Sequence, residues 1–151
     1  ATDVGPVIDN DAKQGLEAHI ERMVAEPTAN ILAQTPMSAS SVVSQEQSTF
    51  VLPTAIEVKS IDVIGGEHFG PILHVLRYQA RDLNKLIDAI NATGFGLTLG
   101  IHSRIENIVE HIERRAFVGN TYVNRNQIGA VVNRSKSGWS TLRCPSHAAK
   151  L

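Results

Sequence analysis

Cysteine is almost absent from this sequence of 151 residues, in which Cys144 is the single example. One cysteine cannot form an intramolecular disulfide, and it excludes zinc or iron–sulfur sites built from several thiolates. No apolar run approaches the roughly 18 residues that a transmembrane helix needs. The first residues, Ala1 to Pro6, also lack the basic and apolar regions of a secretion signal. These absences predict a cytoplasmic protein that neither enters a membrane nor depends on disulfides.

Recognisable metal and phosphate motifs are missing as well. The six histidines show neither the HxH nor the HExxH spacing that brings two imidazoles to one ion, so we predict no metal site. His74 lies in an apolar stretch and is expected to be a hydrogen-bonded core residue. His19 and His111 have polar neighbours on expected helices and should be solvated. Neither GxGxxG nor GxxxxGK(S/T) occurs, so no complete phosphate-binding loop is predicted.

Acidic side chains are absent from the last part of the chain. Residues 114–151 carry seven basic and no acidic side chains, a balance of +7, whereas residues 1–113 carry seven basic and all 15 acidic ones, a balance of −8. A basic stretch that contains Trp139 could bind nucleic acid through its phosphates. Charge alone rarely specifies a partner, so we expect a solvated tail and no nucleic-acid partner.

What the sequence does contain is a regular succession of amphipathic helices and apolar, β-branched strands. Apolar side chains at helical spacing predict helices at residues 10–26, at residues 83–93 and from residue 103 onward. Apolar runs predict strands at residues 49–58, 72–78, 97–101 and 119–124. Pro53 has no N–H to donate, so the strand that contains it should be broken or lie at a sheet edge.

Local signals mark the ends of the predicted helices. Asp9 and Asp82 are the expected N-caps of the first two. Gly94 is expected to end the second helix in the left-handed conformation. Ser103 and Glu106 have the spacing of a capping box, in which each side chain accepts a hydrogen bond from a backbone N–H group.

The order of these elements predicts the fold class. Strands that alternate with helices of this length are typical of parallel βαβ crossovers, whose sheets need cover on both faces. We therefore predict an α/β fold of three-layer βαβ units around a parallel sheet. One covering layer cannot be found in the chain, which predicts that this architecture is incomplete.

One thiol and two glycine-containing connections are the candidate sites. Cys144 is the only possible thiol nucleophile, but the residues around it have no periodicity, and we expect an incidental cysteine. Residues 65–71 place a carboxylate and an aromatic ring between glycines, just before a strand. Residues 124–130 follow the carboxyl end of a strand, where open α/β sheets gather ligands. From the residues alone, each connection could equally be a simple turn.

Four segments resemble one enzyme family. Glu67-His-Phe-Gly-Pro71 resembles the E-x-F-G-P motif of aldehyde dehydrogenases. The other three resemble the 1-pyrroline-5-carboxylate (glutamate semialdehyde) dehydrogenase branch, which includes the dehydrogenase half of bifunctional proline-utilisation enzymes. They are residues 3–9, 91–103 and 119–132. The resemblance covers residues 1–132 and implies that the α/β fold is part of the aldehyde dehydrogenase catalytic domain.

The resemblance implies roles for particular residues. In this family the glutamate at Glu67 accepts hydrogen bonds from the nicotinamide ribose of NAD, which suits a carboxylate with two acceptor oxygens. The phenylalanine at Phe69 packs beside the nicotinamide. The turn at Gly129 and Ala130 resembles the loop whose backbone N–H groups hold the substrate's α-carboxylate, because small side chains allow close approach. The implied substrate is glutamate semialdehyde, oxidised to glutamate in proline catabolism.

The resemblance also implies that the catalytic residues lie elsewhere. The family's nucleophilic cysteine, oxyanion-binding asparagine and general-base glutamate all precede the matching segment, as does most of the NAD-binding domain. We therefore expect a C-terminal portion of the catalytic domain, inactive alone. Residues 133–151 do not align with the family and should form a divergent basic tail. The alternative is a non-enzymatic module that associates with itself or with a full-length dehydrogenase.

Overall fold

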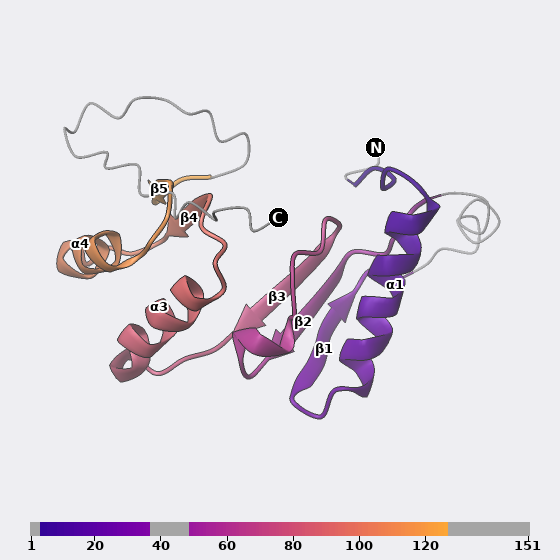
Figure 1. The fold of residues 1–151 in the computed structure, drawn as a ribbon, viewed down its shortest axis with the longest axis horizontal. Helices are drawn as coiled ribbons and strands as arrows, with labels where there is room; N and C mark the ends of the chain where they lie inside the picture. Colours follow the sequence, from indigo (N-terminus) through magenta and orange to yellow (C-terminus); the bar gives the residue numbers. More distant parts are fainter. Residues whose placement is uncertain (1–3, 37–48, 127–151) are drawn as a thin grey trace, which may run out of the picture. The chain divides into compact units, whose positions relative to one another are not determined.

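The computed structural model describes residues 4–36 and 49–126 (Figure 1). These residues form two compact units, which divide between Tyr78 and Gln79. In the first unit, one long helix accompanies a three-stranded sheet. In the second, two helices accompany a pair of parallel strands.

The sheet of the first unit is mixed. The unit's elements are α1 (Asn10–Ala25), β1 (Ala29–Gln34), β2 (Thr54–Val58), the 3-10 helix η1 (Ile61–Val63) and β3 (Ile72–Leu76). The strand order is β1-β2-β3, in which β1 runs antiparallel to β2 and β3 runs parallel to it. Ile56 in β2 pairs with Ile31 on one side and with His74 on the other. The middle strand therefore aligns both of its neighbours.

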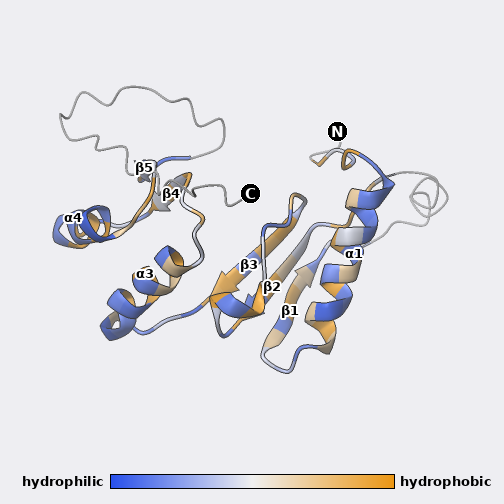
Figure 2. Ribbon diagram, in the orientation of Figure 1, coloured by the Kyte–Doolittle hydropathy of each residue, from blue (hydrophilic) through white to orange (hydrophobic). Residues whose placement is uncertain are grey.

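The hydrophobic core of the first unit joins α1 to the sheet. Met23 of α1 is buried together with Ile56 and Val58, which point from the same face of β2. Partly buried apolar side chains complete this cluster: Ala29, Ile31, Val63, Ile64, Ile72 and Leu76. Figure 2 shows largely hydrophobic strands in this unit and an α1 that mixes hydrophobic with hydrophilic residues. This packing fixes α1 against the sheet.

Sequence predictions for the first unit hold where the signal is local. The helix predicted at residues 10–26 is confirmed as α1, and Asp9 Oδ1 accepts a hydrogen bond from the Ala12 N–H at 2.8 Å, as a cap should. The strand predicted at residues 49–58 begins only at Thr54, after Pro53, and lies in the middle of the sheet. The broken strand is therefore correct and the edge position is wrong.

The first strand, β1, was not predicted by the sequence. It covers Ala29–Gln34, of which only a short apolar piece stands out in the sequence. Its register with β2 shifts between Ile31 and Ala33, and most of its residues are exposed. Because the paired positions in β2, from Ala29↔Val58 to Gln34↔Thr54, are at least 20 residues away along the chain, local periodicity does not reveal β1.

The second unit contains a parallel βαβ connection. Its elements are the 3-10 helix η2 (Ala80–Asp82), α3 (Leu83–Ala92), β4 (Thr98–Ile101), α4 (Glu106–Arg115) and β5 (Asn120–Val123). β4 and β5 pair in parallel, and α4 connects them, which confirms the crossover predicted for this part. Gly94 follows α3 with a φ of +76°, so the predicted left-handed stop is also confirmed.

Two predicted helix caps differ from the expectation because other groups occupy their side chains. Asp82 stands at the N-cap position of α3, as predicted, but its Oδ1 accepts a hydrogen bond from Lys85 Nζ at 2.8 Å rather than from a backbone N–H group. Ser103 Oγ accepts from the Ile105 N–H at 3.1 Å in a short turn, and α4 begins later, at Glu106.

His111 is also not solvated as predicted. It is half-buried, and its Nε2 donates to Asn84 Oδ1 at 2.6 Å, which links α4 to α3. The described helices include none that is long and apolar enough to span a bilayer.

Candidate functional site

The 65–71 loop precedes β3 and carries the two side chains that the resemblance assigns to the nicotinamide and its ribose. It begins at Gly65, whose φ of +83° is a left-handed conformation that glycine adopts readily. Glu67 and Phe69 are both exposed, with 83% of Phe69 accessible. His68, between them, is half-buried. Successive side chains of the loop thus point outward and inward in turn.

The Glu67 carboxylate is available to a ligand. Within residues 4–36 and 49–126 it has no hydrogen-bond or ion-pair partner. The position of a Cβ on the preceding Gly66 is open space. A carboxylate can accept hydrogen bonds from two adjacent hydroxyls, and an aromatic ring beside it can pack on a planar heterocycle.

Leu16 and Arg22 of α1 contact the two ends of the 65–71 loop. A Cβ on Gly70 would collide with the end of the Leu16 side chain, so a larger residue at this point would require that side chain to shift. Arg22 donates from Nη1 to the Val63 carbonyl at 2.9 Å and from Nη2 to the Ile64 carbonyl at 2.8 Å. The amino-terminal base of the loop is therefore attached to the helix by a guanidinium and its other end by apolar contact.

A histidine cluster, formed by His19, His68 and His74, lies under the same loop. His19 Nε2 is 2.9 Å from His74 Nε2, and His19 Nδ1 is 2.9 Å from Arg22 Nη2. The rings of His19 and His68 stack, with centroids 3.5 Å apart. His68 Nε2 also donates to the Ile64 carbonyl at 3.2 Å. The cluster thus joins α1, the loop and β3.

Burial keeps part of the cluster uncharged. Burial, followed by the charges of His68, His74 and Arg22, lowers the pKa of His19 from 6.5 to about 4. Burial, followed by His68 and Arg22, also lowers the pKa of His74. Both imidazoles are therefore neutral near pH 7. His74 is hydrogen-bonded, as predicted, but it is half-buried rather than part of the core. The prediction of a solvated His19 is wrong, since only 4% of it is exposed.

The cluster is a hydrogen-bond network rather than a metal centre. Among the described residues, no group of three or more His, Cys, Asp or Glu side chains is arranged to hold a metal ion. The His19 and His68 rings lie nearly face to face, 26° from parallel, so their nitrogens do not converge on one point.

The carboxyl ends of β4 and β5 are tied by one asparagine. Asn124 follows β5 with a φ of +53°, and its side chain accepts from the Ser103 N–H at 3.0 Å and donates to the Ser103 carbonyl at 2.8 Å. The chain continues toward the predicted substrate-binding residues, Gly129 and Ala130, which lie outside the described residues. Cys144 and the predicted tail at residues 133–151 lie outside them as well.

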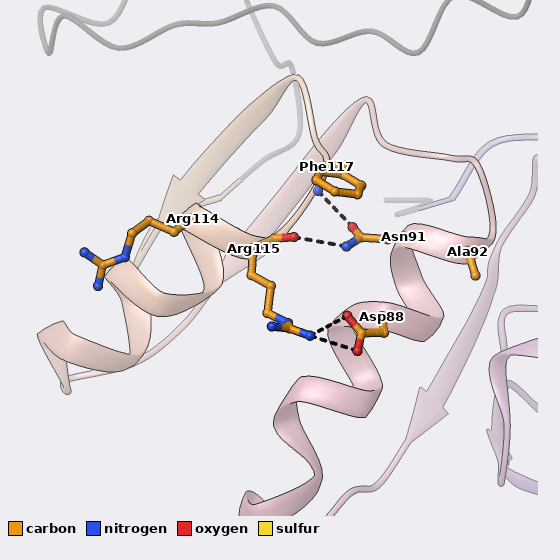
Figure 3. A pocket seen from close by; sticks show the side chains of 6 residues that line it. All are labelled: Asp88, Asn91, Ala92, Arg114, Arg115 and Phe117. Carbon is orange, nitrogen blue, oxygen red and sulfur yellow. Dashed lines mark hydrogen bonds and ion pairs between the residues drawn. The ribbon is translucent and has the colours of Figure 1, made fainter.

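A shallow groove lies between α3 and α4 (Figure 3). Its lining consists of Asp88, Asn91, Ala92, Arg114, Arg115 and Phe117. Asn91 donates to the Arg115 carbonyl at 3.0 Å and accepts from the Phe117 N–H at 2.8 Å. Arg115 Nη2 lies 2.9 Å from both carboxylate oxygens of Asp88. These polar groups are engaged with one another, so they connect the helices and leave little for a ligand.

Sequence reasoning missed three residues that shape the candidate site: His19, Arg22 and Asn124. A signal for the first two is present, because Leu16, His19 and Arg22 follow one another at intervals of three along α1 and so share one face of the helix. Asn124 offers a weaker signal, since asparagine tolerates the left-handed conformation better than most residues.

Known proteins resemble most of this chain. Residues 1–141 match the aldehyde dehydrogenase family. The bifunctional protein PutA of Klebsiella aerogenes is 46% identical over 131 residues, which cover 87% of this chain and 10% of PutA. The 1-pyrroline-5-carboxylate dehydrogenase 1 of Halalkalibacterium halodurans is 29% identical over 131 residues, which cover 85% of this chain and 24% of that enzyme. The chain thus spans about a tenth of the length of the PutA relatives that it matches.

Solved structures agree with the sequence matches. A crystal structure of a mutant of proline utilization A (PutA) from Bradyrhizobium japonicum superposes with a TM-score of 0.76 and 47% identity, over 87% of this chain and 12% of that one. The resemblance to the 1-pyrroline-5-carboxylate dehydrogenase branch is therefore confirmed, as is the incomplete α/β fold of an aldehyde dehydrogenase catalytic domain. By sequence and by fold, this chain belongs to the aldehyde dehydrogenase family.

Proposed function

We propose that this chain supplies the nicotinamide-ribose and substrate-carboxylate part of the catalytic domain of an NAD-dependent 1-pyrroline-5-carboxylate dehydrogenase. The enzyme would oxidise glutamate semialdehyde to glutamate in proline catabolism. The observation that carries the proposal is that Glu67 and Phe69, two residues apart, are both exposed on a loop that α1 holds in place. The matched PutA proteins and the dehydrogenase of Halalkalibacterium halodurans support it.

The residues of the loop fit a nicotinamide nucleotide. Aldehyde dehydrogenases are generally NAD(P)-dependent, and the bound cofactor supplies the hydride acceptor. In the proposal, Glu67 accepts hydrogen bonds from the ribose hydroxyls and Phe69 covers one side of the nicotinamide. The open space at Gly66 leaves room for the sugar to approach the carboxylate.

The substrate's carboxylate is assigned to the backbone N–H groups at Gly129 and Ala130. Asn124 supports this assignment, because its two hydrogen bonds to Ser103 fix the point from which the chain leaves β5 toward these residues. Small residues suit an anion site built from backbone donors, since no side chain blocks the approach.

The proposal gives this chain a binding role and no covalent step. The family's reaction needs a thiolate that attacks the aldehyde, and the sequence offers only Cys144, in a stretch without periodicity. We expect no NADH to form when the purified 151-residue chain is mixed with NAD and glutamate semialdehyde. Formation of NADH that survives in Cys144→Ser would contradict this expectation, and loss of such activity in that variant would identify Cys144 as the nucleophile.

Cofactor binding tests the ribose assignment directly. NAD added to the isotope-labelled chain should shift the NMR signals of the 65–71 loop, and Glu67→Gln should weaken the binding about tenfold, because hydrogen bonds to a charged acceptor contribute most. Glu21→Gln is the matched control, since Glu21 is exposed on α1 and unpaired among the described residues. Equal titrations with NADP would reveal whether the site prefers NAD. An unchanged loop, or equal affinity in wild type and Glu67→Gln, would refute the assignment.

A second candidate is a non-enzymatic module that associates with itself or with a full-length dehydrogenase. Large apolar side chains on the surface of each unit favour it. They include Leu32, Leu73, Phe95, Leu97, Ile105 and Phe117. Light scattering over a range of concentrations tests self-association, and a monomer that also fails to bind a full-length dehydrogenase would exclude this candidate.

A further inference from the structure

The contacts between α1 and the 65–71 loop form a directed chain of hydrogen bonds. A guanidinium has donors only, so His19 Nδ1 must accept from Arg22. His19 therefore carries its proton on Nε2 and donates it to His74 Nε2. His74 must in turn carry its proton on Nδ1. One guanidinium thus sets the tautomers of two imidazoles.

This chain of hydrogen bonds exists only while both imidazoles are neutral. A second proton on His19 would place an N–H against the N–H of Arg22, and a second proton on His74 would place one against the N–H of His19. The permanent charge of Arg22 adds repulsion. The lowered pKa values of His19 and His74 agree with this reasoning.

Among the described residues, the charged groups around the cluster would not stabilise a second proton on His19 or His74. Arg22 faces His19 from the same helix, His68 stacks on it from the loop, and His74 meets it from β3. Hydrogen bonds from Thr28 at 2.7 and 3.1 Å, and to a smaller extent the charge of Arg22, lower the pKa of Glu26. The Glu26 carboxylate is thus engaged by Thr28 rather than by the cluster. Within the described part of the chain, no carboxylate forms an ion pair with this cluster.

We infer that His19 and Arg22 are positioning residues for the 65–71 loop, which they hold through a network that breaks when His19 or His74 takes up a second proton. The inference rests on the proposed function in one respect, namely that the loop presents Glu67 to the nicotinamide ribose and Phe69 to the nicotinamide. His68 links the two, because it stacks on His19 and lies between the exposed Glu67 and Phe69 in the loop.

The tautomers can be measured in the wild-type chain. Long-range ¹H–¹⁵N spectra of the histidine-labelled 151-residue chain should show His19 neutral with its proton on Nε2 and His74 neutral with its proton on Nδ1, near pH 7. A proton on Nδ1 of His19, or a charged His19 or His74 at that pH, would overturn the inference.

Loop order provides the second measurement. The amides of Gly70 and Ile72 report on the loop, because they donate to the His68 and Gly70 carbonyls at 3.0 and 2.8 Å. Their protection from hydrogen exchange should fall about tenfold from pH 7 to pH 5, and about tenfold in Arg22→Lys, since an ammonium cannot replace the planar fork. The amide of Ile56 in β2 should lose less protection than these two amides in either case.

Arg77→Lys is the matched control, because Arg77 is an exposed arginine of the same unit that pairs with Glu57. The inference would be overturned if the protection of the Gly70 and Ile72 amides changed with neither pH nor Arg22→Lys. It would also be overturned if the Ile56 amide lost as much protection as they do. If Arg22→Lys does not fold, the wild-type tautomers and pH dependence decide. None of these readouts needs NAD, so a loop that behaves as expected in a chain that does not bind NAD would refute the proposed function alone.

Discussion

The two units of this chain hold their helices by different means. In the first, α1 is fixed by the buried side chains of Met23 and His19 and by a guanidinium that reaches two carbonyls. In the second, α3 and α4 are connected by Asn91 and by an ion pair between exposed side chains, Asp88 and Arg115. The stability of the first unit should therefore fall in acid and when a buried side chain is truncated. The stability of the second unit should fall when individual hydrogen bonds are removed.

The core of the first unit should give the largest effect. Met23 is fully buried, so Met23→Ala removes contacts and leaves a cavity, with an expected loss of about 2–5 kcal/mol in the free energy of unfolding. Urea unfolding measures the loss, and hydrogen exchange in β2 assigns it to this unit. The neighbouring Val24 is 67% exposed, and Val24→Ala should change stability by less than about 0.5 kcal/mol. Similar losses in both variants would show that this core contributes little.

Acid should have the second-largest effect, and it should lower the stability of the first unit alone. The pKa of His19 is about 4 in the folded chain against an ordinary 6.5, so the unfolded chain binds more protons between these values. The stabilisation is present above about pH 6.5, falls as the pH drops and is exhausted near pH 4, a loss of at most about 3 kcal/mol. Hydrogen exchange in β2 and β4 as a function of pH separates the units. An equal loss of protection in β4 at low pH would contradict the difference between the two units.

Asn91 should have an intermediate effect, confined to the second unit. Asn91→Ala leaves the Arg115 carbonyl and the Phe117 N–H without their partner, which should cost about 1–2 kcal/mol. Asn107 on α4 is exposed, and Asn107→Ala serves as the control, with little change expected. Thermal unfolding gives both values. A loss that also appears in the exchange of β2 would mean that the units do not respond separately.

The ion pair of the second unit should matter least. Asp88 and Arg115 expose 58% and 42% of their side chains, so Asp88→Asn should cost less than about 1 kcal/mol, and salt should shrink the difference. Glu113→Gln, at an exposed position on α4, is the matched control. Denaturation at low and high salt measures the effect. A cost that salt does not reduce would show that the pair acts through packing rather than charge.

The parts of the structure that the sequence predicts correctly are those that depend on near neighbours. α1, its Asp9 cap and the left-handed Gly94 each follow from a few adjacent residues. The Ser103 cap was predicted by the same reasoning and is wrong, because a short turn uses its oxygen. Asp82 stands at the predicted N-cap position, but a lysine occupies its oxygen.

Long-range contacts explain what the sequence could not predict. His19 has polar neighbours along the chain, yet His68 and His74, far away in sequence, bury it. β1 likewise depends on a partner beyond residues 37–48. Glu67 and Phe69 were found through a family motif rather than through periodicity, and their roles, like those of Gly129 and Ala130, remain proposals.

His68 occupies the unspecified position of the E-x-F-G-P motif, where any residue is allowed by the pattern. In this chain the position is coupled to a helix about fifty residues earlier, because the His68 ring lies on His19. Substitutions at 68 and 19 should therefore be non-additive in a double-mutant cycle. Anyone who grafts the five-residue motif onto another scaffold would need to transfer this face of α1 with it.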